Sequence, residues 1–195
     1  MDNALTQYLE LFDTSRDVID SHAPHAINVR RDAAAAALRH IGRLPERGDE
    51  GFEKISLNDM FAPDYGINIA RVDFKAAMPA EFGCDVPNVG ACTAMVVNDA
   101  FTPVGDLAAR LPEGVEMMSL AEAAQLYPEL FAEQIADIDN PVVALNTMFV
   151  QDGVFIRVRR GVRFERPLQV LSLFNASMPL MAARRVLIHV EDGAH

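Results

Sequence analysis

Cysteine, leader segments and long apolar runs are all scarce or absent in this sequence. Cys84 and Cys92 are its only cysteines, and with no export signal they are expected to be free thiols in a reducing compartment. No basic segment followed by an apolar run marks the N-terminus as a secretory signal. No stretch reaches the roughly 18 consecutive apolar residues that a membrane helix requires. We therefore expect a cytoplasmic protein.

The usual catalytic signatures are missing as well. The sequence contains no GxGxxG, no GxxxxGK[ST] and no GxSxG motif, so nucleotide binding and serine hydrolysis lack their ordinary signals. No catalytic pair of carboxylates can be singled out among 28 acidic residues. Against these acids stand 17 Lys and Arg residues, which gives a net charge of −11. Such a charge repels phosphate backbones and anionic lipids, so we expect neither nucleic-acid nor membrane binding.

Cys84 and Cys92 together with His22 and His25 raise the hypothesis of a zinc site. Seven residues separate the cysteines and two separate the histidines. Zinc sites usually have two to four residues between cysteines and three to five between histidines. We therefore expect structural thiols and no metal, and we assign no catalytic or cofactor-binding residue.

Half of the residues are hydrophobic, which is enough for a core, and their spacing predicts helices in the first part of the chain. A first helix is expected from Asp2 or Asn3 to about His22, where Pro24 prevents its continuation. A second should run from Asp32 as N-cap to Gly42 as C-terminal cap. Further expectations are a helical turn over 56–61, a strand near 67–72, a loop over 83–90, a strand over 94–97 with a turn at 98–99, and a helix after the Ser119–Glu122 capping box that restarts at Pro128.

From residue 141 the pattern changes to short alternating segments, and we place a domain boundary there, between 1–140 and 141–195. We expect no helix after the boundary, a turn at 152–153, and strands over 154–159, 162–165, 168–174 and 186–190. Val154, Val170 and Ile188 are spaced by 16 and then 18 residues, as in stacked coils of a parallel β-helix. A β-sandwich of antiparallel hairpins would show the same alternation, and both interpretations stay open. Stacked coils would leave an open sheet edge, which predicts self-association.

Five arginines form the one basic cluster of the acidic chain: Arg157, Arg159, Arg160, Arg163 and Arg166. One interpretation is an electrostatic contact with an acidic partner. The other is the solvated face of a sheet, on which charged side chains protect an edge.

Several blocks in a fixed order resemble the SufD family of the SUF iron–sulfur cluster assembly machine. The blocks are FAPDYGIN at 61–68, CDVPN at 84–88, ALNTM at 144–148, QDG at 151–153, ERPLQV at 165–170, RRVLI at 184–188 and EDGA at 191–194. One departure is that Arg157 and Arg159-Arg160 stand where the family more often has an aromatic residue and a Pro-Lys pair.

The resemblance implies an α+β chain, in which an N-terminal helical or α/β domain precedes the first coils of a right-handed parallel β-helix. It implies a non-catalytic cytoplasmic scaffold that acts with SufB-like and SufC-like subunits. The iron–sulfur cluster would be handled transiently by the full complex, with no cofactor in this N-terminal fragment. Two alternatives remain: a β-helix carbohydrate-active enzyme or acyltransferase, and a free-standing interaction module formed by residues 1–140.

Overall fold

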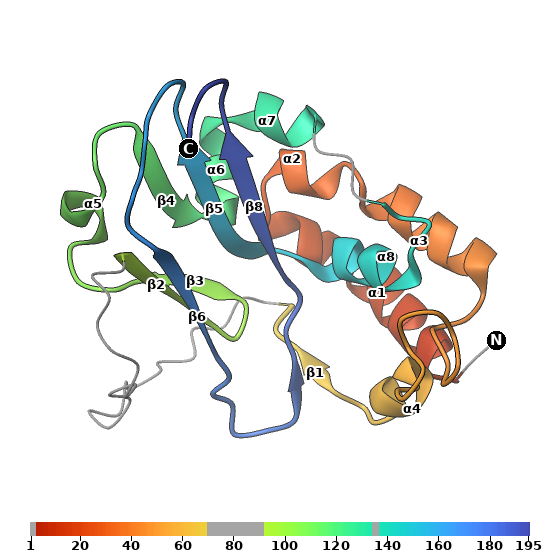
Figure 1. Cartoon of the computed structure of the whole chain (residues 1–195). Coiled ribbons are helices and arrows are strands. Elements are labelled where there is room, and N and C mark those ends of the chain that lie inside the picture. Colours follow the sequence, from red (N-terminus) through yellow and green to blue (C-terminus); the bar gives the residue numbers. More distant parts are fainter. Residues whose placement is uncertain (1–2, 70–91, 134–136) are drawn as a thin grey trace.

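The chain is a mixed α+β structure, with most of the helices on one side and most of the strands on the other, while α5 lies beside the strands (Figure 1). The computed structural model describes residues 3–69, 92–133 and 137–195. No helix within these ranges is long and apolar enough to cross a bilayer. In chain order the elements are α1 (Asn3–Ser21), α2 (His25–Asn28), α3 (Arg31–Ile41), α4 (Leu57–Phe61), β1 (Gly66–Ile67), β2 (Cys92–Val97), β3 (Ala100–Pro103), α5 (Leu107–Arg110), β4 (Val115–Ser119), α6 (Leu120–Leu126), α7 (Pro128–Glu133), α8 (Pro141–Phe149), β5 (Asp152–Val158), β6 (Leu168–Leu173), β7 (Leu180–Met181) and β8 (Arg184–Val190).

The predicted N-terminal helices are confirmed, with one shifted start. The apolar stripe of α1 is buried in a core that also holds the alanines of α3 and the inner face of α8. Gly42 ends α3 in a left-handed conformation, with φ of 73°, and its N–H bonds Leu38 O, as expected for a glycine cap. The predicted N-cap at Asp32 is wrong, because α3 begins at Arg31 and Asp32 lies in its first turn. An acidic side chain suits that turn equally well.

The expectation of no helix after residue 140 is wrong. Pro141 starts α8, and the Asn140 side-chain oxygen accepts hydrogen bonds from the N–H groups of Val142 and Val143. Asparagine at the cap and proline in the first turn form a standard helix start, although the same two residues are also typical of a break between elements. The buried face of α8, including Leu145 and Met148, belongs to the same core as α1 and α3.

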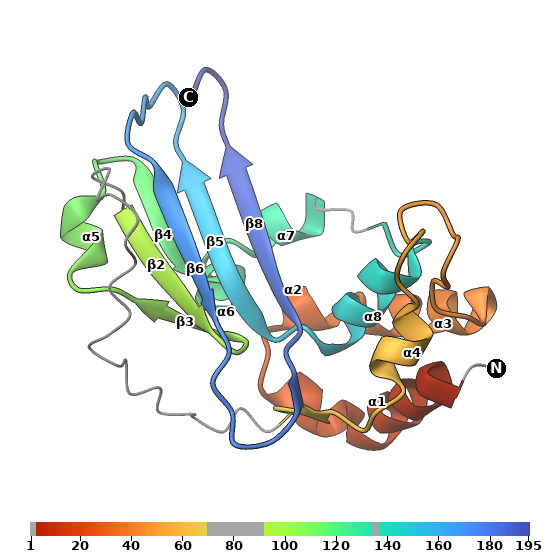
Figure 2. The same ribbon diagram turned by 60° about the horizontal axis from the view of Figure 1, so that its bottom comes forward.

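Two three-stranded sheets, in the orders β3-β2-β6 and β4-β5-β8, enclose a second apolar cluster (Figure 2). A short pair joins β1 to β7. Within the three-stranded sheets β2 pairs antiparallel with β3, and β4 with β5. The β2–β6 and β5–β8 pairs are parallel. Apolar side chains of both larger sheets, among them Ala94, Val96, Val154 and Ile156, fill the space between them.

Residues 152–190 do not fold back as hairpins. The chain leaves β5, joins the other sheet as β6, and returns through β7 to β8, which lies parallel to β5 with Val154 opposite Val186. Val154, Val170 and Ile188 thus lie on β5, β6 and β8, and their spacing reflects a chain that passes from one sheet to the other and back. The expected turn at 152–153 is wrong, because both residues belong to β5, and the expected strand over 162–165 is absent from the structure. The strands over 168–174 and 186–190 are confirmed with small shifts.

Asp152 explains one of these errors. Its buried carboxylate accepts hydrogen bonds from the Ser119 hydroxyl at 2.7 Å, from the Ala121 N–H at 3.1 Å and from the Phe101 N–H at 3.1 Å. A residue that resembles a turn signal in sequence therefore ties the starts of α6 and β3 to β5.

The Ser119–Glu122 cap, the turn at Asn98-Asp99 and the helical turn over 56–61 are confirmed. Of the strand expected near 67–72, Ile67 lies in the short strand β1, Asn68 and Ile69 lie outside it, and residues 70–72 lie outside the described residues, as does the loop over 83–90.

Arg31, which is fully buried, joins the start of α3 to the end of α8, just before the chain enters β5. Its guanidinium donates to Met148 O at 2.6 Å and to Val150 O at 2.7 Å, and it lies 3.3 Å from an Asp20 carboxylate oxygen. Burial lowers the pKa of Arg31 to about 10, although Asp20 opposes that change. The charge therefore satisfies carbonyls at the end of α8 that would otherwise be buried without partners.

The division of the chain at residue 140 stays a prediction. Strands from both sides of that residue share sheets, since β4 pairs with β5 and β2 with β6. The core around α1 likewise includes α8.

Replacing Arg31 with methionine should lower the free energy of unfolding by about 3 kcal/mol, because buried carbonyls lose their donors and Asp20 loses one of its two arginine partners. Urea denaturation measures this change. Arg47→Met is the matched control at an exposed position, where a change under about 0.5 kcal/mol is expected. Equal stability of the two variants would show that Arg31 does not hold the layers together.

Replacing Gly153 with alanine should separate β5 from β8. A Cβ atom built at Gly153 would lie 1.9 Å from Arg185 O, a backbone atom of the paired strand. We expect a loss of about 2 kcal/mol or more, measured by urea denaturation. Gly66→Ala is the control, since its added Cβ would meet only ordinary contacts at 3.6 Å and beyond. A Gly153→Ala protein as stable as this control would contradict the close strand approach.

Candidate functional site

The strongest candidate for a functional surface is the exposed end of the two sheets, which we call the open strand end and define as β6 and β8. These are the last strands of their sheets among the described residues. Each pairs in parallel on one side, β6 with β2 and β8 with β5. A strand edge with free N–H and C=O groups pairs readily with a further strand.

The apolar face of β8 is exposed at this end. Val186, Ile188 and Val190 are 51%, 59% and 52% exposed. Their register partners on β5 are Val154, Ile156 and Val158, which are all buried. Directly paired residues point to the same side of a sheet, so β8 continues the apolar interior of the two sheets into solvent. Phe174 and Met178, which follow β6, add exposed apolar area.

An edge of this kind can add a strand whose side chains match the same alternation. The backbone supplies affinity through ladder hydrogen bonds, and the exposed valine and isoleucine positions supply apolar contact. Scattered exposed apolar residues are ordinary on protein surfaces, whereas a contiguous row marks an interaction site.

The arginine cluster does not form one free basic surface. Arg157 pairs with Glu191 at 2.5 Å and lies over the Tyr127 ring, 4.8 Å from its centre. Arg159 pairs with Glu116 at 2.6 Å, and Arg160 pairs with Asp192 at 2.9 Å. These contacts join β5 to β4 and to the turn after β8, so they support the interpretation as a solvated sheet face.

Arg163 and Arg166, the other two members, line an open groove beside α5 together with Phe164 and Leu111. Arg163 lies 4.0 Å from Glu165, which also lines the groove. The carboxylate at the centre of the cluster, Glu191, has its pKa held below the usual value of 4.5 by the hydrogen bond from Arg157 and by the Arg160 N–H. The cluster is thus partly neutralised within the chain.

Of the residues considered for zinc, the three that the structure describes do not lie together. Cys92 is buried on β2, where its thiol donates to Arg110 O at 3.3 Å, while His22 and His25 are exposed near α2. Cys84 lies outside the described residues. Within the described ranges no three His, Cys, Asp or Glu side chains come together as metal ligands would.

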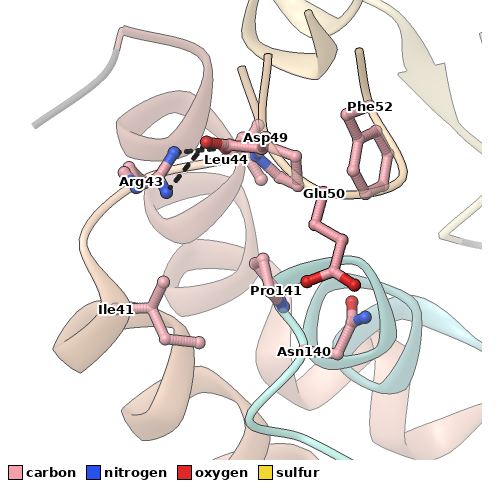
Figure 3. Close-up of a pocket in the computed structure, with 9 residues that line it drawn as sticks. Ile41, Arg43, Leu44, Asp49, Glu50, Phe52, Asn140 and Pro141 are labelled. Carbon is pink, nitrogen blue, oxygen red and sulfur yellow. Dashed lines mark hydrogen bonds and ion pairs between the residues drawn. The ribbon is translucent and has the colours of Figure 1, made fainter. Parts of the chain in front are cut away.

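A pocket of about 300 Å³ lies between the end of α3, the loop that follows it and the start of α8 (Figure 3). Its charged groups include Arg43 and Asp49, which form an ion pair at 2.5 Å, and Glu50, whose carboxylate points toward Asn140. Ile41, Phe52 and Pro141 add apolar surface. The described lining residues include no serine, cysteine or histidine, and the Asp49 carboxylate is paired with Arg43. The pocket therefore shows no assembled pair of nucleophile and base.

Sequence reasoning predicted an open edge but missed its composition. The alternation of β8 was visible, whereas the side of the strand that faces solvent depends on its pairing with β5. The signal that could have identified it is the match between Val154, Ile156 and Val158 and the same spacing at 186–190.

Comparison with known proteins assigns the chain to a family. No curated protein matches the chain. A family model described as the SufBD protein N-terminal region matches residues 2–170, which is most of the chain. The chain therefore belongs to the SufB/SufD family of the SUF iron–sulfur cluster assembly system.

Proposed function

We propose that this chain is a non-catalytic, SufD-like scaffold subunit of iron–sulfur cluster assembly, and that it acts in the cytoplasm with SufB-like and SufC-like subunits. The family match over residues 2–170 is the observation that carries the proposal. The ordered blocks that resemble the SufD family favour SufD over SufB. The match to an N-terminal region further supports the view that the chain is the N-terminal part of a longer protein. Clusters would be handled by the whole complex.

We propose further that β5, β6, β7 and β8 form the first circuit of a parallel β-helix. Two features support this. The return of the chain to a parallel position beside its own earlier strand is the defining step of such a fold, and valine or isoleucine occupies matching positions in β5 and β8. The apolar row on β8 would then be the inner wall on which a following coil stacks.

The open strand end would meanwhile associate with a second copy of this chain. The row of Val186, Ile188 and Val190 is continuous with the core between the sheets. Burying apolar area of this kind contributes about 25 cal/mol per Å², and the unpaired edge adds backbone hydrogen bonds. A larger protein in which further coils cover β8 would not use this surface for self-association.

Co-purification tests the scaffold role. The full-length parent protein, affinity-tagged in its own cells, should retain SufB-like and SufC-like subunits through a wash at moderate salt. A second tagged protein carries an unrelated solubility domain in place of residues 1–195. Comparing the two shows whether this region contributes to the retention of either subunit. Failure of the intact parent to retain either subunit would overturn the proposal.

Self-association should fall when charge is placed on β8. Ile188→Lys puts an ammonium group in the exposed apolar row, which disfavours strand stacking. Sedimentation at increasing protein concentration should show dimers for the unmodified chain and monomers for the variant. The control is Val29→Lys, at a position 57% exposed beyond α2, which should leave the dimer unchanged. A monomeric unmodified chain at high concentration would refute association through this edge.

A further inference from the structure

A further cavity lies where the helices meet β8, and the charged residues that line it are both arginines. It is a small pocket of about 60 Å³ that α2, α6, α7, α8 and β8 enclose. Arg30 and Arg185 supply its charged groups, and Ile27, Phe131 and Leu187 are among its apolar walls. We call it the Arg30–Arg185 pocket.

Most arginines of the described residues have a carboxylate partner. Those with one within 4.0 Å are Arg16, Arg31, Arg39, Arg43, Arg157, Arg159, Arg160 and Arg163. In the part of the chain that the structure describes, Arg30, Arg47, Arg166, Arg184 and Arg185 form no ion pair with a carboxylate, and of these Arg30 and Arg185 line one pocket together. For Arg185, which is partly buried, this matters because a guanidinium group that is removed from water usually requires an anion.

Arg185 is held in place by neutral groups only. Its guanidinium donates to the Asn146 side-chain oxygen at 2.9 Å and to the Thr147 hydroxyl at 2.8 Å. Arg30 makes one long contact, to Ala132 O at 3.4 Å. Burial and the neighbouring positive charge of Arg30 both lower the pKa of Arg185. The two cations therefore repel each other in a partly buried space, and an anion between them would relieve that repulsion.

The shape and lining of the pocket limit what such an anion can be. One water needs about 10–15 Å³ of such volume, so the pocket holds a ligand of about four to six non-hydrogen atoms. Two guanidinium groups match the planar oxygens of a carboxylate. The apolar walls fit a short aliphatic stem.

We propose that the Arg30–Arg185 pocket binds a small carboxylate, with the carboxylate oxygens at the two guanidinium groups and the aliphatic stem against Phe131 and Leu187. The carboxylate is either a free short-chain acid or a glutamate side chain of a protein partner, which presents the same chemistry. Carboxylate binding at this pocket is independent of the iron–sulfur scaffold role.

Titration of the ¹⁵N-labelled chain with propionate at low ionic strength tests the proposal. We expect saturable shifts of the α2 amides and of the Arg30 and Arg185 side-chain N–H signals, with a dissociation constant roughly in the millimolar range for so small a ligand. Propionamide, which has the same shape without the charge, should give no saturable shift. Blocked glutamate, acetylated and amidated, is the second arm: binding by it as well assigns the site to a protein side chain, and binding by propionate alone assigns it to a free acid.

Variants separate charge from folding. Arg30→Gln removes a guanidinium whose one contact within the chain is weak, so the protein should stay folded and bind propionate about tenfold more weakly or worse. Arg30→Lys should recover part of the affinity because it restores the charge. Arg47→Gln, at an exposed position outside the pocket, should bind like the unmodified chain. No saturable shift up to about 100 mM propionate, equal binding of propionamide, or equal losses in Arg30→Gln and Arg47→Gln would overturn the proposal.

Discussion

The buried guanidinium of Arg31 is the contact on which the arrangement of layers depends. It lies at the first residue of α3 and satisfies carbonyl groups at the end of α8, so it fixes where that helix stops and where the chain turns into β5. β5 is the central strand of its sheet and begins two residues after Val150, so this contact lies at the junction between α8 and that sheet. A buried charge is tolerated here because carbonyl oxygens and Asp20 surround it.

Arg185 forms a second polar connection a short distance away. It bonds Asn146 and Thr147 of α8 from the edge strand β8, while Asn146 donates to Arg184 O at 3.1 Å. The helix α8 is thus held from α3 on one side and from β8 on the other. The apolar contacts of the core give most of the stabilisation, and these directional bonds define the angle at which helices and sheets meet.

Local signals predicted the elements that local chemistry determines. The stripe of α1, the left-handed cap at Gly42, the Ser119 cap and the turn at Asn98 all depend on residues within a few positions of each other, and all are confirmed. The same periodicities predicted helices in the first part of the chain and strands in the last, while the α+β arrangement was implied by the family resemblance. The family resemblance added the expectation of parallel pairing among short strands, which periodicity could not distinguish from hairpins.

The errors arose where distant residues decide. Asp152-Gly153 has the composition of a turn, yet the Asp152 carboxylate accepts hydrogen bonds from Ser119 and Phe101. Gly153 leaves room for the backbone of Arg185, which a larger residue would meet. The start of α8 was misread because Asn-Pro can end one element or cap the next. The Arg30–Arg185 pocket was invisible for the same reason, since Arg30 and Arg185 meet only after the circuit from β5 to β8 is complete.

The parallel pairing of β5 with β8 also affects the order in which the strands can pair while the chain is being synthesised. The antiparallel neighbour β4 precedes β5, so one side of β5 can be satisfied as soon as it is made. The other side must wait until Arg184–Val190 has been translated, and until then a strand rich in valine and isoleucine stays half-covered. Contacts so far apart in the chain form slowly, and chaperone binding during translation would protect that side of β5 in the interval.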